Sequence, residues 1–88
     1  MFCVYVLYAI SYDRIYIGYT SNLESRLMSH NFLANKGYTS KFRPWIVVYT
    51  EYFETKKEAI IREKQLKSAK GRLFVRQLIE DFSKRNPG

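Results

Sequence analysis

Two runs rich in β-branched and aromatic residues begin this chain, and only a short polar stretch separates them. Residues 2–9 and 15–20 consist mostly of Val, Ile, Leu and Tyr, a composition that favours strands. Residues 11–14 between them are polar enough to form the loop of a hairpin. The sequence therefore predicts an antiparallel pair of strands at the N-terminus, onto which the rest of the fold must be built.

Two capping-box patterns mark the starts of two helices. In this pattern a Ser or Thr side chain and a Glu side chain three residues later each bond a backbone N–H that would otherwise lack a partner. Residues 21–24 form the first pattern and predict a helix that begins near Asn22. Residues 55–58 form the second and predict a helix that runs to about Ala69.

The rest of the chain supplies a third strand and a third helix. Residues 45–53 are β-branched and aromatic and suit a strand, whereas residues 31–44 show no regular period and predict a long loop. We expect Gly71 to separate the second helix from a last amphipathic helix that covers the sheet. The predicted fold is α+β, a three-stranded sheet flanked by helices in the order β-β-α-β-α-α, with a single domain over residues 1–85 and a frayed end at 86–88.

The net charge indicates a polyanionic partner. Fifteen Lys and Arg against eight Asp and Glu give +7 over 88 residues, which favours salt-dependent binding of nucleic acid. A membrane surface is the rival anion, but no stretch is long and apolar enough to span a bilayer, and no charged region precedes the first apolar run. Cys3 is the only cysteine and is expected in the core. We therefore expect a cytoplasmic protein with a nucleic-acid partner and no membrane partner.

Glu63 is the first polar residue that the pattern does not explain as facing solvent. It shares one helical stripe with Ala59 and Leu66, so its carboxylate should point toward the sheet. A carboxylate at the edge of a core needs a cation. A hard oxygen ligand suits Mg²⁺, which takes one or two carboxylates together with waters and substrate phosphate. The alternatives are an ion pair with Arg or Lys, or an ordinary exposed charge.

Arg26 and His30 are a second set of polar candidates, on the first predicted helix. They are four residues apart and are expected to share a face, with Asn22 one turn earlier. The guanidinium could clamp a phosphate, and the imidazole could orient water or move a proton. A solvated Arg and a His that caps the helix end are the alternatives.

The tyrosines are a third feature, although most of the eight are expected in the core or on the sheet. Strand alternation places Tyr5 on one face with Cys3 and Leu7. It also places Tyr16 on one face with Gly18, and a glycine inside a strand lets another group or a ligand come close. Tyr16 could therefore line a groove. A phenol has a pKa of about 10, so it would need nearby positive charge to act as a base.

Taken in order, these residues resemble the signature of the GIY-YIG nuclease family. Residues 4–6 (Val-Tyr-Val) and 16–18 (Tyr-Ile-Gly) are similar to the two tripeptides of the family, although the first lacks its glycine. Arg26 and His30 then fall on the positions of the first helix, and Glu63 falls on the metal-binding glutamate. The likeness extends over nearly the whole chain.

The resemblance implies a mixed three-stranded sheet and hydrolysis of DNA phosphodiester bonds that depends on Mg²⁺, with Mn²⁺ as a possible substitute. Tyr16 would activate the attacking water, while Tyr5 and His30 would position it and assist proton transfer. Arg26 would hold the scissile phosphate. Glu63 would bind a single divalent ion that polarises the phosphate. Which of the two tyrosines and the histidine is the base stays open.

Residues 41–45 and 62–67 resemble the small stand-alone bacterial branch of the family. Many members carry an Asn beyond the metal-binding glutamate, which this chain lacks before Asn86, and we expect no separate DNA-targeting module. Binding should therefore depend on DNA shape, and a protein partner would direct the chain to its site on the DNA. The candidate contacts are the basic residues of the long loop and of the region around the end of the second helix: Lys36, Lys41, Arg43, Lys67, Lys70 and Arg72.

Two alternatives to a DNA endonuclease with little sequence specificity remain open. The first is a DNA-binding module of the same fold with weak or lost catalysis, which the missing Asn favours. The second is an interaction subunit, which would show no salt-dependent affinity for DNA. The sequence leaves the oligomeric state open.

Overall fold

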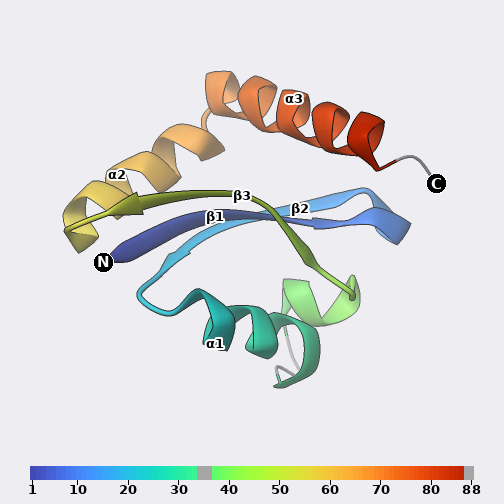
Figure 1. Cartoon of the computed structure of the whole chain (residues 1–88), viewed down its shortest axis with the longest axis horizontal. Helices are drawn as coiled ribbons and strands as arrows, with labels where there is room; N and C mark the ends of the chain where they lie inside the picture. The colour runs from blue at the N-terminus through green and yellow to red at the C-terminus, as the bar shows by residue number, and fades with distance from the viewer. Residues whose placement is uncertain (34–36, 87–88) are drawn as a thin grey trace.

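The computed structural model describes residues 1–33 and 37–86, and a three-stranded sheet forms its centre (Figure 1). The strands are β1 (Phe2–Ala9), β2 (Arg14–Thr20) and β3 (Ile46–Phe53), in the spatial order β2-β1-β3. Both outer strands run antiparallel to β1. The α+β class and the order β-β-α-β-α-α are confirmed. The sheet is antiparallel throughout rather than mixed, because β2 and β3 lie on opposite sides of β1 and do not pair with each other.

A tight turn closes the predicted N-terminal hairpin. A 3₁₀ turn, Ile10–Tyr12, leads into Asp13, whose φ of 50° lies in the left-handed region, which Asp adopts more readily than most residues. The Tyr8 hydroxyl donates a hydrogen bond to the Asp13 carboxylate at 2.9 Å, and Arg76 pairs with the same carboxylate at 3.1 Å. The turn is therefore tied to β1 and to the last helix.

Side-chain caps begin the first two helices. α1 (Leu23–Met28) is capped by Asn22, whose side chain accepts a hydrogen bond from the Ser25 N–H at 3.1 Å. The helix therefore starts where it was predicted, but the cap is one residue later than the Ser of the pattern. α2 (Lys56–Lys67) begins with the capping box predicted at residues 55–58, and both of its hydrogen bonds are present.

A π-helical turn, Ser29–Leu33, follows α1 directly. Such turns are rare and often occur at functional sites. Arg26 on α1 is exposed, whereas His30 in the π turn is buried. His30 therefore lies in a π turn and not on the regular helix that was predicted to carry both residues.

α2 and the last helix, α3 (Ala69–Arg85), meet at Ser68. The Ser68 backbone ends α2, and its hydroxyl caps α3 by accepting a hydrogen bond from the Gly71 N–H at 3.2 Å. Gly71 therefore lies inside the first turn of α3 and does not separate the two helices as predicted. Its role is to let α3 begin close against the end of α2.

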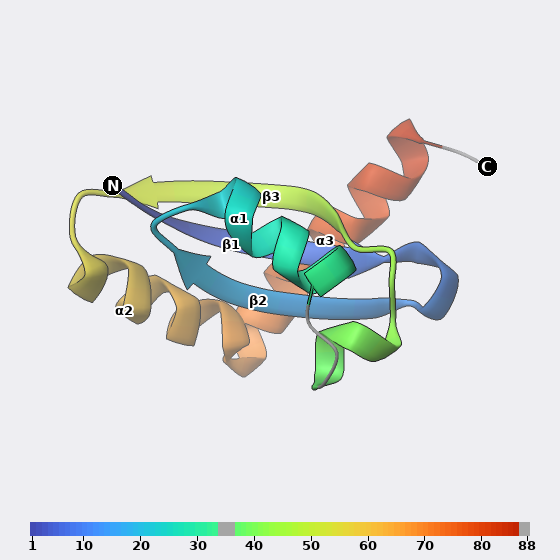
Figure 2. The same ribbon diagram turned by 90° about the horizontal axis from the view of Figure 1, so that it is seen from below.

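The sheet separates two layers of helices (Figures 1 and 2). α1 and the 3₁₀ turn η3 (Tyr38–Lys41), which lies in the predicted long loop, are on one side, while α2 and α3 are on the other. β1 is the central strand and is buried from both sides. The core on the α1 side consists of Cys3, Tyr5, Leu7, Ala9 and Trp45. The core on the α2 and α3 side consists of Val4, Val6, Ala59, Leu66 and Val75.

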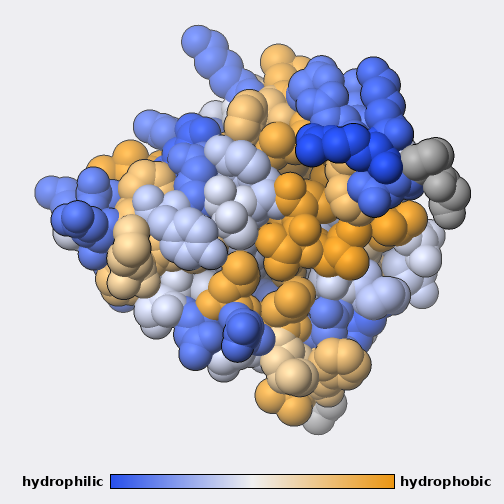
Figure 3. All heavy atoms as spheres, in the orientation of Figure 1, coloured by the Kyte–Doolittle hydropathy of each residue, from blue (hydrophilic) through white to orange (hydrophobic). Residues whose placement is uncertain are grey.

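The surface carries both polar and apolar regions. In Figure 3 hydrophilic side chains gather at the C-terminal end of α3, and hydrophobic ones gather over the sheet between α3 and α1. None of the helices in the described part of the chain has the length and apolar character needed to cross a membrane.

Candidate active site

A buried tyrosine and a buried histidine form the centre of the candidate site. Tyr5, in the middle of β1, is 1% exposed, and His30, in the π turn, is 7% exposed. The Tyr5 hydroxyl and His30 Nε2 lie 3.0 Å apart and share a hydrogen bond. Two residues that the sequence singled out separately are therefore in direct contact, although they are 25 positions apart in the chain.

Tyr16 and Gly18 lie on β2 beside this pair. The centroid of the Tyr16 ring is 4.8 Å from that of His30 and 6.2 Å from that of Tyr5. Gly18 is opposite Tyr5 in the hairpin, and a Cβ at this position would lie 2.7 Å from Tyr5 Oη. Because the Tyr5 ring is buried and hydrogen-bonded, it has little room to move. The close approach that a glycine within a strand permits is thus made here by the Tyr5 phenol.

Hydrogen bonds from neighbouring segments hold the backbone around His30. The Asn31 side chain donates to the Trp45 carbonyl at 3.0 Å and accepts from the Trp45 N–H at 2.6 Å. Arg43 Nε donates to the His30 carbonyl at 2.7 Å. These contacts fasten the π turn to the start of β3, and they give Arg43, a predicted nucleic-acid contact, a bond within the protein.

Arg26 and Glu63 reach the same centre from opposite sides of the sheet. Arg26 lies on α1, whereas Glu63 lies on α2 with a side chain that is only 16% exposed. Both act on the Tyr5 hydroxyl, since the guanidinium lowers the pKa of Tyr5 and the carboxylate raises it. The other four predicted polar residues therefore each contact Tyr5 or act on it electrostatically: Tyr16, Arg26, His30 and Glu63.

Burial shifts the proton equilibria of the central pair. It is the main cause that raises the pKa of Tyr5 to about 12, with further contributions from Tyr16 and Glu63 that Arg26 opposes. Burial also lowers the pKa of His30 from its usual 6.5, and the positive charge of Arg26 adds to this effect. At neutral pH Tyr5 is therefore protonated and His30 is neutral, so a ring nitrogen can accept the phenol proton.

The buried His30 predicts a loss of stability in mild acid. Its pKa is lower in the folded chain than in the unfolded chain, where it is about 6.5, so below that pH the unfolded state binds more protons and the free energy of unfolding falls with pH. A His30→Gln variant keeps a hydrogen-bond acceptor for Tyr5 but cannot titrate. In urea unfolding between about pH 6.5 and pH 5 its stability should fall less steeply than that of the wild type. Parallel pH profiles for the two proteins would contradict this expectation.

Glu63 offers one oxygen donor group, and the chemistry of the donor set decides which metal it suits. Its Oε1 pairs with Lys67 Nζ at 3.3 Å. Among the residues that the structure describes, no three His, Cys, Asp or Glu side chains gather into a metal cluster. This set does not fit Zn²⁺, which takes three or four protein ligands. It fits Mg²⁺, which binds through one or two carboxylates and keeps several waters.

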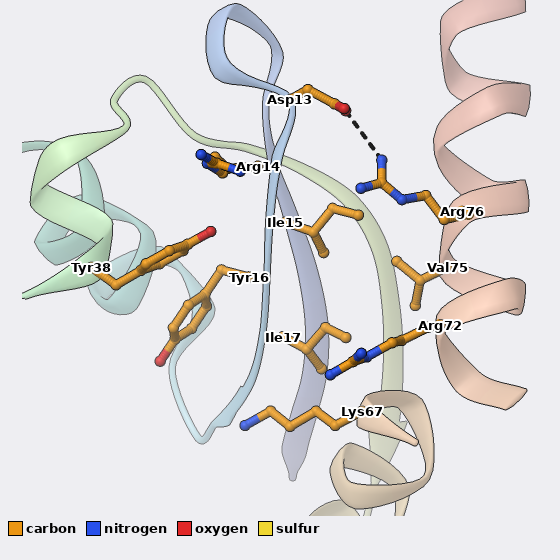
Figure 4. Close-up of a pocket in the computed structure, with 10 residues that line it drawn as sticks. All are labelled: Asp13, Arg14, Ile15, Tyr16, Ile17, Tyr38, Lys67, Arg72, Val75 and Arg76. Atoms are coloured by element: carbon orange, nitrogen blue, oxygen red, sulfur yellow. Dashed lines mark hydrogen bonds and ion pairs between the residues drawn. The ribbon is translucent and has the colours of Figure 1, made fainter. Parts of the chain in front are cut away.

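The predicted nucleic-acid contacts that the structure describes do not share one cavity. Lys67 and Arg72 line a cavity at the outer side of β2 (Figure 4). Lys70 instead lines a second, smaller cavity between the surfaces of α2 and α3. Lys41 is exposed at the end of η3, and Lys36 lies outside the described residues. Of the described members of this set, Lys67 and Arg72 therefore line the cavity beside Tyr16, and Arg43 contacts the backbone of His30.

The cavity in Figure 4 also contains residues that the sequence did not single out. It measures about 540 Å³, and Arg14, Tyr38 and Arg76 line it together with Tyr16. Arg14 carries a usable signal, because it is two residues before Tyr16 on the same strand and therefore faces the same side. Tyr38 and Arg76 carry none, since only the tertiary fold brings η3 and α3 to β2.

The fold and the cluster together define the class of protein. A small α+β domain brings two tyrosines of its hairpin against a histidine, and an arginine and a recessed glutamate act electrostatically on one of these tyrosines. The chain belongs to the GIY-YIG family, whose model for the GIY-YIG catalytic domain matches residues 1–77. The resemblance noted in the sequence is thereby confirmed.

Several curated relatives are UPF0213 proteins, a designation that states no activity. One from Staphylococcus haemolyticus is 43% identical over 56 residues, which are 64% of this chain and 68% of the relative. One from Clostridium perfringens is 42% identical over 55 residues, or 62% of this chain and 59% of the relative. One from Natronomonas pharaonis is 38% identical over 65 residues, or 74% and 75%. The chain thus spans about six tenths to three quarters of their lengths, and no solved structure matches it significantly.

Proposed function

We propose that this protein is a divalent-metal-dependent endonuclease that hydrolyses DNA phosphodiester bonds with little intrinsic sequence specificity. The observation that supports it most is the buried hydrogen bond between Tyr5 and His30, with the Tyr16 ring against it. Buried polar groups at this density are costly unless they are satisfied. Here they converge on one point where a positive guanidinium and a negative carboxylate also act.

In this proposal Tyr16 is the phenol that meets the attacking water. It lines the cavity at the outer side of β2, whereas Tyr5 is almost completely buried. A pKa of about 12 keeps Tyr5 protonated. Tyr5 is therefore suited to donate a hydrogen bond to His30 and orient it, rather than to act as the base. The neutral His30 can then take up a proton, and its fastened backbone keeps the ring in place.

Arg26 is proposed to hold the scissile phosphate. Its guanidinium is exposed on α1, so it can contact a ligand, yet it still acts electrostatically on Tyr5 and His30. Guanidinium groups bind phosphate oxygens in a bidentate way, and they stabilise the charge that develops as the bond to the leaving oxygen breaks.

Glu63 is proposed to hold the divalent ion, with Mg²⁺ the best fit and Mn²⁺ a possible substitute. When bound, such an ion supplies Lewis-acid polarisation of the phosphate. The recessed carboxylate pairs with Lys67 in the structure. If substrate binding broke this ion pair, Glu63 would be free to bind the divalent ion and Lys67 could pair with a phosphate of the DNA.

Low sequence specificity follows from the kind of contact that is available. The candidate contacts are Arg and Lys side chains, which position a nucleic acid through its phosphates but do not read its bases. The proposal includes a protein partner that directs the protein to its site on the DNA. The second candidate function is a DNA-binding module with weak or lost catalysis, and the observation that favours it is that no three metal-ligating side chains gather among the described residues.

Substitution of Tyr16 tests the proposed chemistry. A Tyr16→Phe variant keeps the ring against His30 but removes the hydroxyl, so cleavage of labelled DNA should fall by roughly 100- to 10,000-fold while binding is kept. Tyr19→Phe is the matched control, because Tyr19 lies on the same strand but packs on the other face of the sheet. Cleavage by Tyr16→Phe at the rate of the control would exclude Tyr16 from the proton transfer.

A further inference from the structure

We propose that the cavity along the outer edge of β2 binds a single strand of nucleic acid and presents one of its phosphates to Tyr16. This inference rests on the proposed function and specifies its substrate. We call the cavity the edge groove and define it by the side chains along its two walls and the strand between them (Figure 4). The walls are lined by Arg14, Tyr16 and Tyr38 on the α1 side and by Lys67, Arg72 and Arg76 on the α3 side.

The edge groove follows the unpaired side of an outer strand. β2 pairs only with β1, so its other edge faces the groove, and Ile15 and Ile17 also lie along it. The volume of about 540 Å³ lies in the range of clefts that hold small ligands, roughly 300–1,000 Å³. A space of this size suits one or two nucleotides of one strand.

The charge of the edge groove suits a phosphate backbone. Arg72 makes no ion pair with any described residue, so its guanidinium is available to a ligand. Arg76 is partly neutralised by Asp13, while Arg14 stacks over the Phe42 ring at 5.2 Å. Lys67, at 3.3 Å from Glu63, joins the groove to the proposed metal ligand. Cations on both walls thus follow a path that ends at the reaction centre.

Tyr38 gives the edge groove a surface on which a base can stack. Its side chain is 46% exposed, although its ring also packs against Phe42 at 5.0 Å and Trp45 at 6.0 Å. Trp45 Nε1 donates to the Thr39 carbonyl at 2.8 Å and fixes this segment in place. A rigid, half-exposed aromatic ring beside a basic track is the combination that binds single strands. Bases within a duplex are already stacked and offer Tyr38 no free face.

Fluorescence anisotropy with chelator present tests the edge groove without any cleavage. The probes are oligothymidine and oligouridine of about twelve nucleotides and a duplex of the same length. The single strands should bind more tightly than the duplex. Tyr38→Leu should weaken single-strand binding by at least about five-fold and leave duplex binding unchanged, because each stacked base contributes at least that much.

Matched variants separate stacking from folding and from general charge. Tyr38→Phe keeps the ring and should bind like the wild type, whereas Tyr52→Leu removes an exposed tyrosine from β3, outside the groove, and should change nothing. Arg72→Gln should lower the salt dependence for single strands by about 0.7 in the logarithmic slope. Arg85→Gln, on the same helix but outside the groove, should not.

Two results would overturn the edge-groove proposal: a duplex that binds as tightly as the single strands, or a Tyr38→Leu variant that behaves like Tyr52→Leu. Preferential binding of oligothymidine, oligouridine or both over the duplex supports it. Failure of the proposed function is a separate result. Cleavage without single-strand preference overturns only the groove, and single-strand binding that depends on Tyr38 without cleavage overturns only the nuclease.

Discussion

A Glu63→Gln variant is expected to lose metal-dependent cleavage by roughly a thousand-fold, since a bound ion contributes several kcal/mol to the stabilisation of the transition state. The amide has the size of the carboxylate but carries no charge to hold a divalent ion. Binding of DNA should be kept or become slightly tighter, because a negative charge near the phosphates is removed. The variant should fold, since among the described residues Glu63 pairs only with the half-exposed Lys67.

Two readouts and one control make this expectation specific to the site. The rate of cleavage reports the chemistry, and electron paramagnetic resonance of added Mn²⁺ reports metal binding without DNA or turnover. Glu24→Gln, an exposed substitution in the first turn of α1, gives the same change of charge and should match the wild type in both. A Glu63→Gln variant that cuts and binds Mn²⁺ like Glu24→Gln would show that the ion is held elsewhere.

A Gly71→Ala variant is expected to lose at least about 3 kcal/mol of unfolding free energy, and its Tm should fall by at least about 12 °C. A Cβ at this position would lie 2.1 Å from the Gln65 carbonyl oxygen and 2.5 Å from the Leu66 Cα. Both are backbone atoms, which cannot move away as the end of a flexible side chain could. The junction of α2 and α3 would have to open, and Leu66 and Val75 would then lose their packing in the core.

Thermal unfolding followed by circular dichroism measures this effect. Lys70→Ala, an exposed neighbour in the same turn of α3, is the control and should leave the Tm nearly unchanged. If Gly71→Ala melted at the temperature of Lys70→Ala, the junction would have room for a side chain. The glycine would then serve another purpose than close approach of the helices.

The strands, and the faces that Tyr5 shares with Leu7 and Tyr16 shares with Gly18, could be predicted because they depend on a period of two. Once residues 2–9 and 15–20 pair as a hairpin, alternation decides which side chains share a face. The capping box at residues 55–58 was equally readable, since its donors and acceptors are local. Glu63 was found from its place on an apolar stripe, and it is indeed recessed.

The geometry around His30 could not be predicted in the same way. A π turn differs from an α-helix by a single backbone step, and it is stabilised here by Asn31 and Arg43 contacts with distant segments. No local pattern encodes such contacts. The same holds for Gly71, which looks like a helix break in the sequence but is required by the close approach of α3 to α2.

The edge groove shows a further limit of local patterns. Its basic residues come from β2, α2 and α3, and its stacking tyrosine comes from a segment that the sequence predicts to be irregular. Counting cations along the chain put Lys67, Lys70 and Arg72 together, but the helix surfaces send Lys70 to a different cavity. Only the packing of α2 and α3 on the sheet decides which charges face the site.

The most direct test of the account is cleavage by the purified wild-type protein of labelled duplex, flap, branched and single-stranded DNA. Each substrate is incubated with Mg²⁺, with Mn²⁺ and with a chelator. The account predicts cutting with either ion and none with the chelator. Absence of cutting under every condition, or equal cutting with the chelator, would contradict the proposal that Glu63, Tyr16 and Arg26 form a metal-dependent nuclease site.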